Sequence, residues 1–84
     1  MRVEISDHAW AQLTELPLLV RSRVAGVLER LATWPNVSGV KWLTGEWKHH
    51  ARIRTGDYRV IFHLVPGGAI LIDRIAHRRD VYAE

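Results

Sequence analysis

The chain has 84 residues, 48% hydrophobic and 25% charged, which is typical of one folded domain and unlike a disordered chain. It contains no cysteine, which excludes disulfides and thiolate metal sites and fits a reducing compartment. Twelve basic residues, ten of them arginine, against nine acidic residues give a net charge of +3. This balance favours a polyanionic partner, either nucleic acid or an acidic protein segment.

The first residues contain no apolar signal-peptide core, and no apolar run of the sequence is long enough to span a bilayer. We therefore expect a cytoplasmic protein that does not bind a membrane. Because the chain is too short for two independent cores, we expect residues 1–84 to form a single domain.

The first half of the chain predicts a strand followed by two helices. Residues 2–5 favour a short edge strand, and Ser6 or Asp7 can cap the helix that follows. Pro17 lacks a backbone donor, so we expect it to separate this helix from the next. Pro35 ends the second helix, and the tight connection predicts an antiparallel helical hairpin. The second helix has an apolar stripe with helical spacing, formed by Val20, Val24, Val27, Leu28 and Leu31.

The second half predicts three strands, at about residues 47–55, 57–65 and 69–77, after a connection over residues 37–46. The third strand is apolar on both faces, which favours a central position. The predicted fold class is α+β. An N-terminal strand and a helical hairpin would pack on a small, mainly antiparallel, twisted β-sheet.

The first two of these strands form the most informative segment. Gly56-Asp57 suits a two-residue loop, which pairs Arg54 with Arg59. Strict alternation then gives one apolar face, with Ala51, Ile53, Tyr58, Val60, Phe62 and Leu64. The other face is basic, with no acid from this hairpin, and carries His50, Arg52, Arg54, Arg59, Ile61 and His63. Because like charges on neighbouring strands cost stability, this face is either a solvated outer surface or an anion site, since guanidinium groups match phosphate oxygens.

Other side chains have a structural interpretation. The four tryptophans fit the core or the edge of the domain better than base stacking. Asp73 and Asp80 are expected to pair with neighbouring arginines. His49 alternates to the face opposite His50, so this pair is a poor chelate and no metal site is expected.

Four segments give the chain a family resemblance. They are Leu43-Thr-Gly45, Arg52-Ile-Arg54, Gly56-Asp-Tyr-Arg-Val60 and Ile75-Ala-His-Arg-Arg-Asp-Val-Tyr82. Following a strand and two helices, they resemble the RelE/ParE superfamily of toxins from bacterial toxin–antitoxin systems over nearly the whole chain. The resemblance implies a RelE-like fold and a cognate antitoxin that assembles with the toxin and provides its only link to DNA. We favour the RelE-like branch, whose members are implied to cleave mRNA, often in the ribosomal A site.

The resemblance also implies roles for individual residues. Arg59 matches the arginine that contacts the scissile phosphate, Arg78 the arginine near the C-terminus, and Tyr82 the terminal tyrosine. His50 and Arg52 fall where RelE-type enzymes have basic residues.

The chain departs from this pattern at three places. Thr44 replaces an arginine and His50 replaces a lysine. The spacing from Arg78 to Tyr82 is also shorter than usual, so Arg79 could take the place of Arg78.

Cleavage of RNA without a metal or other cofactor needs a base for the 2′-hydroxyl, cations for the phosphorane and an acid for the 5′-oxygen. The product would be a 2′,3′-cyclic phosphate. Arg59 and Arg78 are the predicted charge stabilisers, while His50, His77 and Tyr82 are the candidates for proton transfer. The residues expected to bind mRNA on the ribosome are Arg52, Arg54, Lys48 and Arg79.

Alternatives remain both for single residues and for the whole chain. His77 could simply end a strand, and Tyr82 could anchor the tail. The whole chain could also be a non-nucleolytic, ParE-like poison of DNA gyrase, or a decayed toxin that acts only as a binding module.

Overall fold

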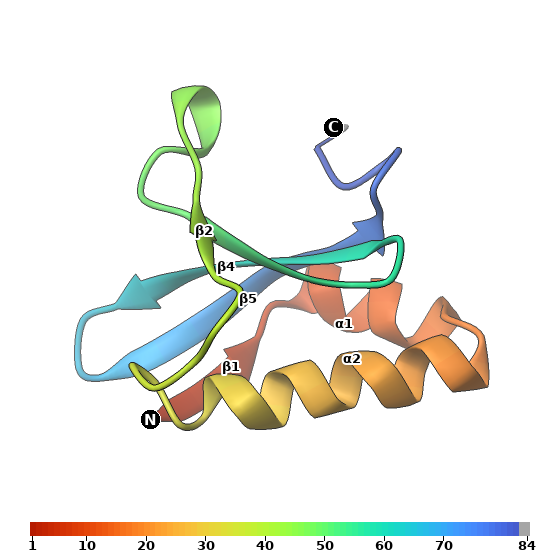
Figure 1. The fold of residues 1–84 in the computed structure, drawn as a ribbon, viewed down its shortest axis with the longest axis horizontal. Helices are drawn as coiled ribbons and strands as arrows, with labels where there is room; N and C mark the ends of the chain where they lie inside the picture. Colours follow the sequence, from red (N-terminus) through yellow and green to blue (C-terminus); the bar gives the residue numbers. More distant parts are fainter. Residues whose placement is uncertain (83–84) are drawn as a thin grey trace.

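The computed structural model describes residues 1–82. Its elements are β1 (Arg2–Ile5), α1 (Asp7–Glu15), α2 (Leu18–Leu31), β2 (Lys41–Trp42), the 3-10 helix η1 (Gly45–Trp47), β3 (Ala51–Thr55), β4 (Tyr58–Val65) and β5 (Ala69–His77). The strands form one sheet in the order β1-β5-β4-β3-β2, in which only β1 and β5 pair in parallel. Both helices cover one face of the sheet, and η1 and the C-terminal turn rise from the other (Figure 1). The predicted α+β fold is confirmed.

Both helices begin where the sequence predicts. Ser6 caps α1, because its Oγ accepts a hydrogen bond of 3.0 Å from the Ala9 N–H. Pro17 stands immediately before α2 and separates it from α1. Within residues 1–82, no helix is long and apolar enough to cross a membrane. The apolar helix faces and the near face of the sheet form the core, with Ala9, Leu13, Leu16, Val24, Val27, Leu31, Ala51, Ile53, Val60, Phe62, Ile70, Ile72 and Ile75.

The β3–β4 hairpin has the predicted register, with Arg54 opposite Arg59. Gly56 adopts a φ of 58°, the left-handed region that a primed two-residue turn requires. The first predicted strand, however, starts too early. Residues 47–50 are not extended, because His49 has a φ of 72° and Trp47 belongs to η1.

The connection over residues 37–46 also contains a strand that the sequence pattern did not reveal. In β2, Lys41 pairs with Arg52 and Trp42 with Ala51, so that β3 is not an edge strand. A strand of this length is too short for alternation to identify it.

A β-bulge in β5 decides which residues face away from the helices. Ile61 pairs with Arg74 and Phe62 with Ile72, which leaves Asp73 without a partner in β4. Ile72 and Ile75 therefore both face the core, and Asp73 and Arg74 both face the open side of the sheet. β5 lies between β1 and β4, as its apolar pattern predicts.

The C-terminal turn, residues 78–82, follows β5 on the open side. The Val81 N–H donates to the carbonyl of His77 over 3.0 Å, which closes one turn. The last two residues of the tail lie outside the described part of the chain.

Candidate functional site

The sheet face opposite the helices carries arginines from three adjacent strands. In one row, Arg52 on β3 and Arg74 on β5 flank Ile61 on β4. In the next row toward the hairpin turn, Arg54 lies opposite Arg59. Because side chains two residues apart share a face, the register gathers the basic ladder predicted from alternation and adds Arg74 to it.

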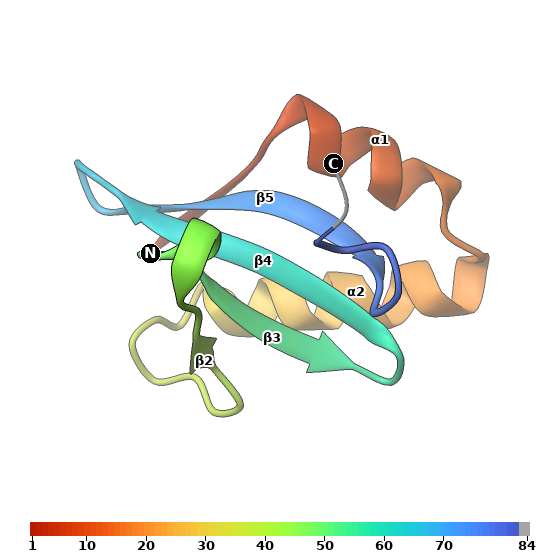
Figure 2. The ribbon, with the colours of Figure 1, turned by 90° about the horizontal axis from the view of Figure 1, so that it is seen from above.

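The 3-10 helix and the C-terminal turn stand over this face (Figures 1 and 2). The guanidinium carbon of Arg74 lies 4.8 Å from the centre of the Trp47 ring, and its Nη1 donates to the Val81 carbonyl over 3.1 Å. The Trp47 ring meets Tyr82 edge to face at 6.1 Å. Val81 is fully buried although it lies outside the helix-side core. Arg74 therefore connects the sheet to both segments that cover it.

Two hollows lie between these segments and the sheet, and we refer to them together as the cleft. They share Trp47 and Tyr82. The first has a volume of about 390 Å³ and is lined by Lys41, Trp42, Leu43, Thr44, Trp47, Arg52 and Tyr82. The second has a volume of about 270 Å³ and is lined by Glu46, Trp47, His50, Arg74 and Tyr82. The cleft thus combines aromatic walls with guanidinium groups and one imidazole.

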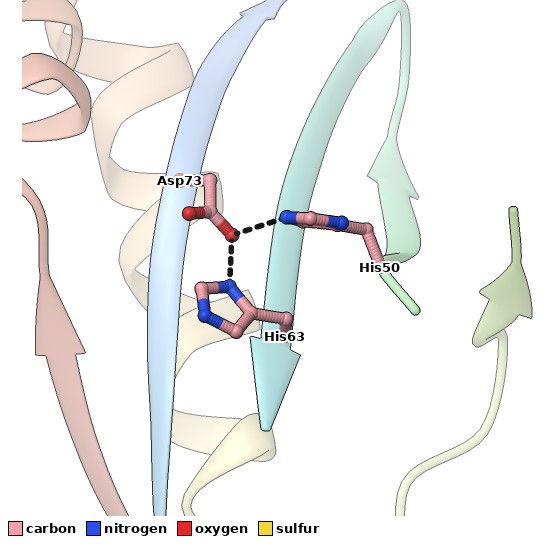
Figure 3. A group of neighbouring side chains, drawn as sticks. All are labelled: His50, His63 and Asp73. Carbon is pink, nitrogen blue, oxygen red and sulfur yellow. Dashed lines mark hydrogen bonds and ion pairs between the residues drawn. The ribbon is translucent and has the colours of Figure 1, made fainter. Parts of the chain in front are cut away.

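His50 belongs to a cluster with His63 and Asp73 (Figure 3). Asp73 Oδ2 lies 2.7 Å from His63 Nδ1 and 3.6 Å from His50 Nε2. The two imidazole rings are 4.9 Å apart between their centres. The expectation that Asp73 pairs with an arginine is wrong, because the bulge directs its carboxylate toward the histidines of neighbouring segments. Within residues 1–82, Asp80 forms no ion pair.

The structure brings some of the predicted residues into the cleft and leaves others outside. His50, Arg52 and Tyr82 line it. Arg54 and Arg59 lie one row away on the same face.

Arg78 lies at the tip of the hairpin, where its backbone N–H donates to the Asp57 carbonyl over 2.7 Å. Its Nε is 3.9 Å from Asp57 Oδ1. Arg79 is exposed in the C-terminal turn.

His77 and Lys48 lie apart from the cleft. The His77 ring packs edge to face on Tyr58 at 5.5 Å, and both residues line a hollow against the end of α1 on the helix side of the sheet. Lys48 lies at the end of η1 and lines a different hollow, together with His49 and Leu64.

Sequence reasoning missed Trp47, Arg74 and Asp73 as parts of this site. The alternation did place His63 on the same face as His50, which was a usable signal. No feature of the sequence predicts the bulge that turns Asp73 and Arg74 to the open face of the sheet.

The model of a protein family, the ParE toxin of type II toxin–antitoxin systems (parDE), matches residues 3–82. The chain belongs to this family. Its membership confirms the predicted RelE/ParE superfamily, and this ParE-family protein is therefore a toxin of the type II class. No curated protein matches its sequence significantly.

Solved structures share the fold of this ParE-family toxin. The RelBE2 toxin–antitoxin complex from Mycobacterium tuberculosis has a chain that is 22% identical, with a TM-score of 0.79 over 92% of this chain and 96% of that one. The YoeB/ParE toxin from Agrobacterium tumefaciens is 12% identical, with a TM-score of 0.77 over 92% and 98%. The isolated E. coli RelE toxin is 13% identical, with a TM-score of 0.74 over 90% and 82%.

Proposed function

We propose that this ParE-family toxin is a metal-independent endoribonuclease that cleaves mRNA on the ribosome. The observation that carries the proposal is the position of three side chains around the cleft, beside a row of further arginines: Arg52 lines one hollow, His50 lines the other, and Tyr82 lines both. Guanidinium groups bind phosphate oxygens in pairs of hydrogen bonds, and the aromatic walls offer surfaces on which bases of single-stranded RNA stack.

His50 is the proposed general base. Its Nδ1 lies 3.2 Å from the Lys48 carbonyl, which can only accept a hydrogen bond. A neutral ring that donates a hydrogen bond from Nδ1 to this carbonyl keeps its lone pair on Nε2, where it would accept a proton. Asp73, 3.6 Å from Nε2, would stabilise the imidazolium that forms when Nε2 takes a proton. His77 is not used, because its ring packs on Tyr58 at the helix side of the sheet.

The reaction would proceed by attack of the ribose 2′-oxygen on the adjacent phosphorus. The 2′-hydroxyl proton moves to His50 Nε2, and the bond to the 5′-oxygen breaks as this oxygen receives the proton of the Tyr82 hydroxyl. Arg52 and Arg59 stabilise the negative charge on the non-bridging oxygens. The products are a 2′,3′-cyclic phosphate and a 5′-hydroxyl, and a proton returns from His50 to Tyr82 through solvent.

We infer further that a cognate antitoxin restrains the toxin. The structurally similar RelBE2 protein is a toxin–antitoxin complex, and the basic cleft suits the acidic segment of such a partner. Arg54, Arg78, Arg79 and Lys48 would then bind flanking phosphates of the RNA when the antitoxin is absent.

Incubation with free RNA in EDTA and with mRNA-programmed ribosomes tests the proposal. Cleavage should yield 5′-hydroxyl and cyclic phosphate ends, and it should need no divalent metal on the free RNA. A second candidate, poisoning of DNA gyrase, is favoured by the ParE name of the matching family. Gyrase-dependent DNA breaks without cleavage of either RNA would overturn the nuclease proposal in favour of this candidate.

A further inference from the structure

Three donor atoms of two kinds converge on the open face of the sheet, next to the cleft. His50, His63 and Asp73 each offer one donor atom, and these atoms lie within 4.8 Å of one another. Asp73 Oδ2 lies 3.6 Å from His50 Nε2 and 2.7 Å from His63 Nδ1. Figure 3 shows the two imidazoles turned toward the same carboxylate oxygen. The residues come from the segment before β3, from β4 and from β5, so that only the fold brings them together.

We propose that His50, His63 and Asp73 form a binding site for one zinc ion. Zinc sites bound by three protein ligands, with water at a fourth position, combine histidine and carboxylate ligands. The ligand bonds measure about 2.0–2.2 Å, which places two ligands of a tetrahedral ion roughly 3.3 Å apart. The measured separations of 2.7 Å and 3.6 Å from Asp73 Oδ2 lie on either side of that value.

The surroundings hold the ligands in a suitable orientation. A hydrogen bond from His50 Nδ1 to the Lys48 carbonyl, 3.2 Å away, would leave the Nε2 lone pair to coordinate the ion. Ser6 Oγ donates to the Asp73 carbonyl over 3.3 Å, which anchors the bulge to the start of α1. The three side chains are between 21% and 29% exposed, so that an ion can enter from solvent.

The chemistry of the donors selects the kind of ion. Two imidazole nitrogens and one carboxylate suit zinc and similar transition metals, whereas magnesium and calcium prefer sites made of oxygen. Neutral histidines with one carboxylate leave a bound zinc complex with a single positive charge. Arg74 is the nearest cation along the chain, and its guanidinium is directed to the Trp47 ring and the Val81 carbonyl.

A zinc ion and the hydrogen on His63 Nδ1 would occupy the same position between His63 and Asp73. The hydrogen bond between His63 Nδ1 and Asp73 requires a hydrogen on that nitrogen, because the carboxylate only accepts. Zinc binding must displace this hydrogen to the Nε2 position of His63 or to solvent.

Titration of the tag-free full chain with zinc chloride, followed by calorimetry, tests the site without RNA. We expect one zinc per chain and no detectable binding of magnesium. Asp73→Asn and His63→Gln should each weaken zinc binding at least about tenfold, the lower range for a change in a metal site. His49→Asn is the matched control, because His49 is exposed, has a φ of 72° that asparagine tolerates, and lies outside the cluster.

A second measurement, NMR spectroscopy of the imidazole groups, uses the unaltered protein. Its result therefore does not depend on whether a variant folds. Zinc should shift the imidazole NMR signals of His50 and His63 and leave those of His8 and His49 in place. Absence of zinc binding, or binding that shifts the signals of His8 or His49 instead, would overturn the proposal. Because no RNA is present, either result leaves the nuclease proposal untouched.

Discussion

Asp73 Oδ2 lies 2.7 Å from His63 Nδ1, on the neighbouring strand of the sheet. Regular pairing of β5 with β4 would turn either Asp73 or Arg74 toward the core, and the bulge turns both outward. The extra residue in β5 therefore places Asp73 on the open face, where it is the one carboxylate among the described residues of β3, β4 and β5. It also places Arg74 there, which contacts Trp47 and the Val81 carbonyl.

Replacing Asp73 by asparagine tests what this pair contributes to stability. A hydrogen bond to a charged group contributes about 1.5–3 kcal/mol, and partial exposure reduces this to about 1 kcal/mol. We expect Asp73→Asn to lower the free energy of unfolding in urea by about this amount at neutral pH. Asp57→Asn is the control, since Asp57 is 66% exposed and 3.9 Å from Arg78; equal losses in the two variants would contradict the expectation.

Substitution by alanine should have opposite effects on stability at two glycines, Gly56 and Gly26. Gly56 has a φ of 58°, so that alanine there is strained although nothing lies near the added Cβ. Gly26 is in α2, where an added Cβ also meets nothing within 4 Å. Gly56→Ala should cost about 1 kcal/mol of unfolding free energy, and Gly26→Ala should add about 0.5–1 kcal/mol. Thermal unfolding measures both, and a stabilising Gly56→Ala would show that the turn differs from the one described.

The arginines of the open face should carry the proposed RNA cleavage. Arg52→Ala and Arg59→Ala should each reduce the rate by about 10²–10³, the cost of removing one donor that stabilises transition-state charge. Neither should change the unfolding free energy by more than about 0.5 kcal/mol. Arg23→Ala, in the exposed part of α2, should leave cleavage intact. Cleavage at the original rate in the Arg59 variant would remove that residue from the site.

Trp47 should matter more than its partial exposure suggests. It contacts His50 at 5.2 Å, Tyr82 at 6.1 Å and the Arg74 guanidinium at 4.8 Å. Aromatic pairs and cation–π contacts contribute about 0.5–1.5 kcal/mol each. Trp47→Ala should therefore lose about 2 kcal/mol and slow cleavage of RNA, because His50 and Tyr82 lose their shared support.

Trp10→Ala provides the comparison for this change. Trp10 is 56% exposed on α1, on the other side of the molecule. Its loss should leave both the stability and the rate of cleavage nearly unchanged. Equal losses of unfolding free energy in urea for the two variants would show that the contacts of Trp47 add no stability beyond that of an exposed tryptophan.

Zinc should inhibit the proposed nuclease, because an ion bound to His50 Nε2 occupies the lone pair of the general base. Excess zinc should lower the rate of cleavage of free RNA, and EDTA should restore it. The ratio of the rates with and without zinc should approach one in His63→Gln, whatever the rate of that variant alone. If His63→Gln left the ratio of the two cleavage rates unchanged, the inhibitory zinc would bind elsewhere. The calorimetric titration with zinc would still test binding to His50, His63 and Asp73.

Sequence alone determined the elements that depend on local periodicity and on turn chemistry. The stripe from Val20 to Leu31, the break at Pro17 and the loop at Gly56-Asp57 all appear in the structure where the pattern predicts them. Alternation in the hairpin also predicted the row of arginines, because the period of a strand fixes the face of every residue once the loop is known. The four motif segments led to the superfamily that the family match confirms.

Only the tertiary structure decided which residues of separate segments meet. The bulge at Asp73 interrupts the period of two, so that no rule of alternation predicts the faces of Asp73 and Arg74. The left-handed His49 and the 3-10 helix turn Trp47 and His50 over the sheet instead of continuing β3. The contacts of Asp73 with His50 and His63 depend on both irregularities, and irregular backbone is where local pattern carries the least information about position in space.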